Sequence, residues 1–286
     1  MVSGPENVQF RLVHTEEAGI IAVATSNIRK GARIISEHAL FRVPRRQDDD
    51  TSPGSGVADK VNVLNDNDRA TFFNLHNSHL EEADPAVGLV MTNAMPLGPN
   101  SPEAGIFPIC PRLNHSCIAN AHYSWNAQDQ AVNIYATCDI TEGKEITVSY
   151  IDNKIWLLPH CQRQAQIKER FNFLCQCKLC TSSPEEIAAS DGRRCQIAYS
   201  DTRMNDPRAA KDYPSEALSC CHRIFELLLT EAEGELQARA PQLYFDAMQI
   251  CSFNSDYARA SVFARLSVEA WRTWQGPHPN GIEKVE

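Results

Sequence analysis

The sequence predicts an α+β protein, with short β-sheets in the first half of the chain and helices in the second. Two observations support this prediction, and a third indicates a metal site between the two regions. Residues 8–43 and 121–151 contain short runs in which apolar and polar side chains alternate with the period of two that strands require. From about residue 184 onward, apolar side chains recur at helical spacing. Between these regions, "FLCQCKLC" at residues 173–180 places three cysteines within six residues.

The composition indicates an acidic protein that stays inside the cell. The 286 residues include 27 basic and 36 acidic side chains, and the net charge of −9 disfavours direct nucleic-acid binding while suiting a basic substrate. No apolar run approaches the ~20 residues of a membrane span, and the N-terminus lacks the pattern of a signal peptide. We therefore expect no membrane association and a location in the nucleus or cytoplasm.

A helical insert interrupts the N-terminal β-region. Residues 8–43 contain three strand-like runs joined by turns, which predicts a small antiparallel meander, and a polar loop follows at 44–56. Beyond the loop, amide and acidic residues at 65–68 are typical of a helix start. The apolar positions that predict two helices here are Val57, Val61, Leu64, Phe72, Phe73 and Leu75. Strand patterns return at residues 121–125, 131–138 and 145–151.

One short pattern occurs twice. "NIRKGARI" at residues 27–34 and "DITEGKEI" at residues 139–146 share an amide or acid, an isoleucine, two polar residues and a glycine, followed by a second isoleucine. Glycine adopts a positive backbone φ at little cost, so we expect the same type of turn to precede a strand at both places.

The C-terminal region predicts two or three antiparallel helices stacked as a cap. "SEALSCCHRIFELLLTEAEG" at 215–234, "APQLYFDAMQIC" at 240–251 and residues 260–271 are amphipathic at helical spacing. We interpret their apolar stripes as core rather than as a cofactor site.

The cysteines indicate a metal site. Eleven cysteines in a chain without a secretory pattern favour metal binding or free thiols over disulfides. Cys175, Cys177 and Cys180 supply three thiolates at a spacing that suits zinc, and a closed tetrahedral site requires a fourth ligand. Candidates for that ligand are Cys117, Cys161, Cys110 and His160. The alternative is a group of buried thiols without metal.

Three segments together resemble a known family. "RLNHSCIAN" at 112–120, "EGKEITVSYID" at 142–152 and "FNFLCQCKLC" at 171–180 are similar to the signature of SET-domain protein-lysine methyltransferases, in the expected order. The helical insert, "TNAMPL" at 92–97 and the helical tail resemble the SET-and-MYND (SMYD-like) branch. No MYND finger is expected, because the early region where it would be inserted contains no cysteine.

The resemblance implies a domain organisation. We expect SET-domain β-sheets around a threaded, pseudoknot-like segment formed near residues 114 and 150, with a C-terminal helical (TPR-like) cap over the substrate cleft. The implied parts are an N-terminal SET portion (8–56), a helical insert (57–95), a C-terminal SET core (96–157), a post-SET zinc element (158–183) and a helical C-terminal region (184–286).

The resemblance also implies a cofactor and its contacts. S-adenosylmethionine would bind at Asn114 and His115, with further contacts from Gly19, Ile20, Asn93 and Phe173. Zn²⁺ would be held by Cys117, Cys175, Cys177 and Cys180. The family's N-terminal loop usually has a second glycine where this chain has Ile21, and a β-branched side chain resists the conformations that glycine permits.

Tyr150 matches the family's catalytic tyrosine. Methyl transfer requires a neutral lysine amine, and we expect Tyr150 to position that amine rather than to act as a strong base. Phe171 stands in the lysine channel where the family often has a tyrosine, and the missing hydroxyl favours higher methylation states.

The resulting prediction is a monomeric lysine methyltransferase that acts on a histone or non-histone protein. A second hypothesis, motivated by Ile21 and Phe171, is a SET-derived, zinc-stabilised interaction module with weak or no catalysis. A third hypothesis, a zinc-containing nucleic-acid binder, is disfavoured by the net charge and by the lack of a basic helix.

Overall fold

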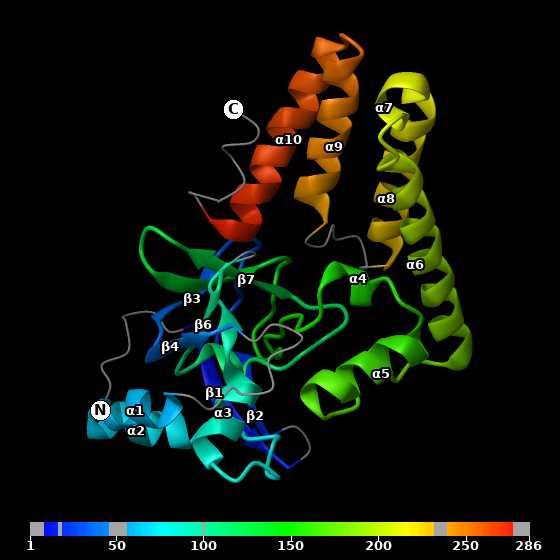
Figure 1. Cartoon of the computed structure of the whole chain (residues 1–286). Helices are drawn as coiled ribbons and strands as arrows, with labels where there is room; N and C mark the ends of the chain where they lie inside the picture. Colours follow the sequence, from blue (N-terminus) through cyan, green and yellow to red (C-terminus); the bar gives the residue numbers. More distant parts are fainter. Residues whose placement is uncertain (1–8, 17–18, 46–55, 99–100, 232–238, 277–286) are drawn as a thin grey trace.

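A computed structural model describes residues 9–16, 19–45, 56–98, 101–231 and 239–276. Small sheets and a helical insert form one part of the molecule, and long helices form the other (Figure 1). The α+β class is therefore confirmed. Most of the polar loop at 44–56 and the last ten residues of the predicted C-terminal region lie outside the described residues.

The N-terminal strands belong to three separate sheets. β1 (Phe10–Thr15) pairs with β2 (Gly19–Ala24) in a hairpin. A second sheet has the order β3 (Arg33–His38), β8 (Ala131–Ala136), β7 (Ala121–Asn126), and a third has the order β4 (Phe41–Pro44), β6 (Glu103–Ile106), β5 (Met95–Pro96). The predicted meander is wrong, because β3 and β4 pair with strands from later in the chain. Alternation along a strand indicates its buried face but does not select its partner.

The repeated turns pair with each other. Gly31 and Gly143 have φ values of 79° and 83°, as expected for this turn. Ile28 and Ile140 exchange two backbone hydrogen bonds of 2.8 Å. The side chain of Asn27 accepts from the N–H of Glu142, and that of Asp139 accepts from the N–H of Lys30. The two turns therefore exchange equivalent backbone and side-chain hydrogen bonds, which relates them by a local pseudo-two-fold symmetry.

The helical insert packs on the third sheet. Its helices are α1 (Val57–Asn62), α2 (Asp66–Phe73) and α3 (Pro85–Asn93). Asn65 caps α2 by accepting from the N–H of Asp68, as the polar run at 65–68 predicts. Buried side chains of the three helices share a core with strands β4 and β6; these residues include Val57, Val61, Phe72, Leu89, Val43 and Ile106.

The segment at 145–151 is extended but is not a regular strand, which corrects the sequence prediction. It forms only isolated bridges within the described structure, Val23 to Glu145 and His115 to Val148. The expected alternation survives at Ile146 and Val148, which are more buried than Thr147 and Ser149, whereas Tyr150 at the end of the same face is partly exposed. The segment pairs first with β2 and then with residues 114–116, so neither partner accompanies it far enough to form a ladder.

The second half of the chain is helical, with a 3₁₀ turn at Cys110–Arg112 (η1) before it. The helices are α4 (Asn153–Trp156), α5 (His160–Phe171), α6 (Pro184–Met204), α7 (Ala209–Asp212), α8 (Pro214–Glu231), α9 (Ala240–Phe253) and α10 (Tyr257–Gln275). α6 lies beside α8, and α9 lies beside α10 (Figure 1). The C-terminal end of α10 contacts the sheet that contains β7 and β8. None of the helices in the described ranges has the length and apolar character that crossing a bilayer would require.

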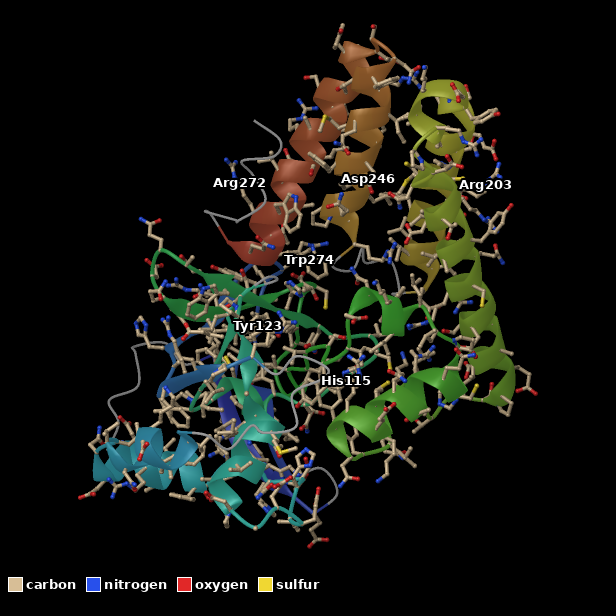
Figure 2. The ribbon with its side chains drawn as sticks, in the orientation of Figure 1. His115, Tyr123, Arg203, Asp246, Arg272 and Trp274 are labelled. Atoms are coloured by element: carbon tan, nitrogen blue, oxygen red, sulfur yellow. The ribbon has the colours of Figure 1, made fainter. Side chains whose placement is uncertain are left out.

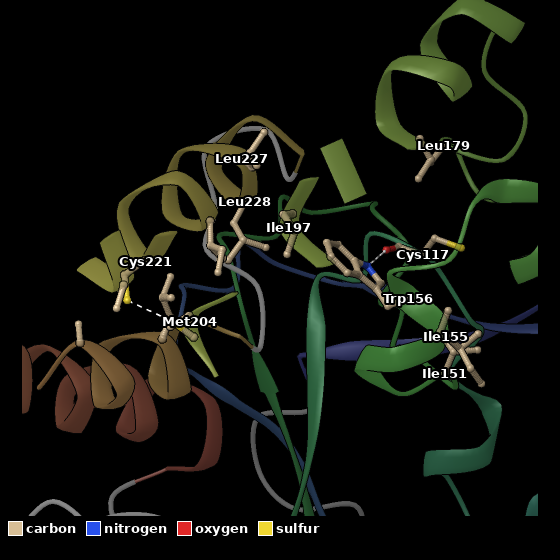
Figure 3. Close-up of a cluster of buried hydrophobic side chains, with 14 of the residues drawn as sticks. Cys117, Ile151, Ile155, Trp156, Leu179, Ile197, Met204, Cys221, Leu227 and Leu228 are labelled. Atoms are coloured by element: carbon tan, nitrogen blue, oxygen red, sulfur yellow. Dashed lines mark hydrogen bonds between the residues drawn. The ribbon is translucent and has the colours of Figure 1, made fainter. Parts of the chain in front are cut away.

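A continuous core joins these helices to the cysteine-rich element. Trp156, Ile167 and Ile197 are buried in one cluster with Cys117, Cys175 and Cys180. Figure 3 shows the Trp156 indole beside Cys117, with Ile197, Leu227 and Leu228 on the side of the long helices. The apolar stripes of the tail are thus core, as predicted.

The end of α10 is fitted closely to β7 and β8. Trp274 meets the imidazole of His122 edge to face, with ring centroids 5.4 Å apart. Gly276 has a φ of 84°, and a side chain there would collide with the Tyr135 hydroxyl. Burial lowers the pKa of His122 from 6.5 to about 4.

We predict that this joint weakens in mild acid. Because the pKa of His122 is lower in the folded chain, the unfolded chain binds the extra proton between pH 6.5 and pH 4, and the free energy of unfolding falls as the pH drops through that window. The loss should be up to about 3 kcal/mol. Denaturant unfolding of wild-type and His122→Gln proteins measures it, with exposed His38→Gln as the control. Equal pH dependence in wild-type and His122→Gln would contradict the prediction.

Candidate active site and metal centre

Two segments that are far apart in the sequence lie side by side at the centre of the site. His115 and Val148 form a parallel bridge. The N–H of Val148 donates to the carbonyl of Asn114, and the N–H of Ser116 donates to the carbonyl of Val148, each at 3.0 Å. The motif at 112–120 is thereby held against the segment that ends at Tyr150, as expected.

His115 links this pairing to the cysteines. His115 as a whole is 8% exposed, and its ring Nδ1 accepts from the backbone N–H of Tyr150 at 3.0 Å. In the neutral ring the proton then resides on Nε2. That nitrogen lies 3.6 Å from the Sγ of Cys117. His115 therefore connects the backbone of Tyr150 to a sulfur atom, near the middle of the molecule (Figure 2).

Four aromatic rings gather around the same point. The centroid of Tyr150 lies 5.4 Å from that of His115, 5.4 Å from that of Phe171 and 6.3 Å from that of Phe173. Phe171 ends α5, and Phe173 follows a left-handed Asn172 with a φ of 58°. The chain reversal at Asn172 therefore places both phenylalanines beside Tyr150.

The Tyr150 hydroxyl is held in a neutral state. It donates to the carbonyl oxygen of Leu113 at 2.7 Å. Burial raises the pKa of Tyr150, and the nearby charge of Glu145 raises it further. The residue as a whole is still 36% exposed, so part of the ring is reachable from solvent. A neutral phenol with its proton engaged has oxygen lone pairs that can accept a hydrogen bond.

Glu145 is a site residue that the sequence did not single out. Its carboxylate accepts from the side-chain Nδ2 of Asn114 at 3.0 Å. Asn120 holds the same segment: its Nδ2 donates to the carbonyl of Glu145, and its Oδ1 accepts from the N–H of Thr147, both at 2.8 Å. The only sequence signal for Glu145 was its position within the family-like segment "EGKEITVSYID".

The remaining cofactor candidates, Gly19, Ile20 and Asn93, belong to other elements, and among the described residues their contacts are local. Gly19 begins β2 at a φ of 69°, and apart from its chain neighbours no heavy atom of the described residues lies within 4 Å of where a Cβ would sit. Ile20 and Ile21 continue that strand and pair with β1. Asn93 is buried at the end of α3, and its Nδ2 donates to the carbonyls of His76 and Leu89. Its amide hydrogens are therefore engaged within the insert, and only its oxygen remains for a ligand.

Four cysteine sulfurs form a compact cluster. The Sγ atoms of Cys117, Cys175, Cys177 and Cys180 all lie within 4.8 Å of one another. Cys117 is 3.6 Å from Cys180 and 4.0 Å from Cys175. A zinc–sulfur bond of about 2.3 Å places the corners of a tetrahedron about 3.8 Å apart. The donor set and spacing therefore fit Zn²⁺.

The cluster selects Cys117 among the four candidate ligands. Cys110 is buried beside Glu37, whose carboxylate accepts its backbone N–H, while Cys161 is exposed on α5. His160 is engaged with Gln164. Hydrogen bonds among the thiols lower the pKa of Cys117 and raise the pKa of Cys175 and Cys180, so the cluster as a group favours a shared thiolate.

The cluster is anchored by its neighbours. Gln164 of α5 exchanges two hydrogen bonds with the backbone of Cys175, at 2.8 and 2.9 Å. The indole N–H of Trp156 donates to the carbonyl of Cys117 at 2.8 Å (Figure 3). The metal ligands are therefore supported by α4 and α5 as well as by each other.

A cavity among the C-terminal helices lies away from the Tyr150 cluster. A space of about 510 Å³ between α8, α9 and α10 is lined by residues such as Leu218, His222 and Arg259. It contains none of the candidate site residues. The chemistry-bearing side chains gather instead at the Tyr150 cluster.

Comparison with known proteins agrees with this geometry. Residues 19–151 match the family model described as SET domain. The chain is 29% identical over 282 residues to the histone-lysine N-methyltransferase set5 of Schizosaccharomyces pombe, and the alignment covers 96% of this chain and 82% of that protein.

Two relatives from vertebrates also match. The chain is 24% identical over 289 residues to N-lysine methyltransferase SMYD2-A of Danio rerio, covering 91% of this chain and 65% of that protein. It is 25% identical over 181 residues to N-lysine methyltransferase SMYD2 of Homo sapiens, covering 59% and 40% respectively. This chain thus spans less than two thirds of both SMYD2 relatives, and the resemblance to the SMYD-like branch is confirmed.

We predict that Cys117→Ser abolishes stoichiometric zinc binding, because serine is a poor ligand for zinc and three thiolates do not close the site. Metal binding at such a site contributes to folding, so the free energy of unfolding should also fall, by roughly several kcal/mol. Elemental analysis and thermal unfolding measure both effects. Cys161→Ser, at an exposed position on the adjacent helix, should retain the metal. Full zinc content in Cys117→Ser would show that the cluster is not the site.

Proposed function

Because residues 19–151 are a SET domain and the chain belongs to the SET-domain family, we propose that it transfers a methyl group from S-adenosylmethionine to the ε-amine of a protein lysine. The observation that carries this proposal is the gathering of Tyr150, His115, Phe171 and Phe173 beside the Asn114 turn. These residues provide a phenol for orientation, an apolar lining and a polar turn within one small region.

The reaction requires a neutral amine in line with the methyl group. A free lysine has a pKa near 10.4, so deprotonating it at neutral pH costs about 4 to 5 kcal/mol. When bound, S-adenosylmethionine supplies an electrophilic methyl group on a positively charged sulfur. The aromatic rings of Phe171 and Phe173 exclude water, and an apolar surrounding favours the neutral form of an entering amine.

Tyr150 acts by positioning the amine. Its proton is directed to the Leu113 carbonyl, so its oxygen can accept an N–H of the lysine and orient the nitrogen lone pair. A phenol whose pKa is raised by burial is the wrong group for a strong base, because it remains protonated at neutral pH. The proposed role is therefore orientation.

The cofactor contacts are part of the proposal. Asn114, fixed by Glu145, presents a polar turn, and His115 stabilises the same turn from its buried side. Gly19 and Ile20 are proposed to line the opposite side, since within the described part of the chain a Cβ at Gly19 would meet no heavy atom beyond its chain neighbours. Phe173 supplies an aromatic face, and Asn93 contributes through its oxygen.

The partner is proposed to be a protein that presents a lysine, either a histone or another protein. A net charge of −9 attracts a basic segment through long-range electrostatics. All eleven cysteines are free, which is consistent with the proposed setting in the nucleus or cytoplasm. We propose a monomer, because one chain supplies every site residue named above.

We predict that Tyr150→Phe lowers the rate of methyl transfer by about a hundredfold while S-adenosylmethionine binding changes little, because only the orienting oxygen is lost. The measurement is transfer of radiolabelled methyl groups to histone and cytosolic protein mixtures. Tyr199→Phe, at an exposed position on α6, is the matched control. If the wild-type protein binds the cofactor yet labels no lysine, the interaction-module hypothesis is favoured.

We also predict that Phe171→Tyr shifts the product toward monomethyl-lysine. A hydroxyl at this position, 5.4 Å from Tyr150 between ring centroids, would hold water in space that a second methyl group needs. Mass spectrometry of the methylated substrate measures the distribution. Strictly monomethylated product from both proteins would contradict the proposed role of Phe171.

A further inference from the structure

Arg163 of α5 has an unusual environment. Its side chain is 0% exposed. Nη1 donates to the carbonyl of Leu158 at 2.6 Å and to Oδ1 of Asp191 at 3.2 Å. Nε and Nη2 are also buried, yet they have no hydrogen-bond partner among the residues that the structure describes. A guanidinium cannot lose its charge, so unsatisfied donors of this kind are costly unless they face an acceptor.

The cysteine cluster lies next to this side chain. The adjacent residue, Gln164, exchanges hydrogen bonds with the backbone of Cys175. Ile167, one turn later, packs in the same core as the four cysteines. Burial alone would lower the pKa of Arg163, but the neighbouring charges of Cys117 and Cys180 raise it. The unpartnered donors thus belong to a residue that interacts electrostatically with two sulfurs of the cluster as well as with Asp191.

The charge of the cysteine cluster with zinc bound would explain why a buried arginine lies beside it. One Zn²⁺ and four thiolates carry a net charge of −2, and such a charge in a buried site requires cations or donors close by. Arg194 stacks on Trp156 at 4.0 Å and pairs through Nε with Glu231 at 2.8 Å, so that only its Nη2 is buried without a partner among the described residues. Arg163 has two donors left over and a weaker, partly exposed partner in Asp191.

We propose that Arg163 is the counter-cation of the zinc–thiolate centre, with its Nε–H and Nη2–H donating to the sulfurs of Cys117 and Cys180. It is a positioning residue, because it acts on the ligands and not on the substrate. The inference depends on zinc in the cysteine cluster and is independent of methyl transfer.

Asp191 extends this link to the helical tail. It belongs to α6, and both of its carboxylate oxygens accept the N–H of His160 at 2.9 Å, which caps the start of α5. The same carboxylate contacts Arg163. Loading of the metal centre therefore stabilises the packing of α6 on α5 through a single buried arginine.

The test compares Arg163→Met and Arg163→Lys with Arg193→Met. Arg193 lies on α6 and pairs with Glu231 at 2.7 Å, so its variant removes a positive charge and a salt bridge from the same region but none directed at the sulfurs. Three readouts are measured: zinc affinity by chelator competition, the sulfur-to-cobalt absorption of cobalt-substituted protein, and alkylation of each cysteine by mass spectrometry.

We expect Arg163→Met to bind zinc 10- to 100-fold more weakly, the range typical for lost outer-shell partners. The cobalt absorption should move to longer wavelength, because a thiolate without its donors holds its electrons less tightly. Cys117 and Cys180 should be alkylated faster relative to exposed Cys161 and Cys195. Arg163→Lys should lie between, since it retains the charge but not the planar fork.

Unchanged absorption and alkylation in both Arg163 variants would overturn the proposal, and so would equal effects from Arg193→Met. If Arg163→Met does not fold, Arg163→Lys decides between the outcomes. Purified wild-type protein that does not bind zinc would also overturn it. A protein that binds zinc but transfers no methyl group would leave this inference intact and contradict only the proposed function.

Discussion

The convergence of four cysteine sulfurs is the constraint on which the rest of the site depends. Cys117 comes from the central motif, and its three partners come from a segment almost sixty residues later. Closing this cluster brings the end of α5 to the central motif and so places Phe171 and Phe173 beside Tyr150. A buried group of thiols would be weakly held by packing alone, whereas a bound metal makes the same contacts part of the folding free energy.

Burial and hydrogen bonding then determine the chemistry that the site can perform. His115 joins a sulfur on one side to the backbone of Tyr150 on the other, so the metal element and the phenol cannot move independently. The Leu113 carbonyl takes the phenol proton, and Glu145 fixes the Asn114 amide. The resulting site is suited to orientation and exclusion of water, which are the requirements of methyl transfer to an amine.

Features that depend on local spacing could be predicted from the sequence, and features that depend on distant partners could not. Cysteine spacing and family resemblance predicted the four cysteines that come together, and glycine predicted the shape of the repeated turns. The predictions of a meander at 8–43 and of a regular strand at 145–151 are wrong, because strand pairing depends on residues that are distant in the sequence. The sequence analysis did not single out Glu145, whose place in the "EGKEITVSYID" segment was its one signal, or Arg163, because charged residues that pair inside the fold look like solvated ones in the sequence.

The central claim is that the metal centre organises the cofactor turn. Calorimetric titration with S-adenosylmethionine of zinc-replete protein, of chelator-treated protein and of an Asn114→Ala variant tests it most directly. We expect clear binding to the zinc-replete protein, and none or greatly weakened binding in the other two samples. Equal affinity with and without zinc, in protein shown to be metal-free, would contradict the claim that the four sulfurs hold the site together.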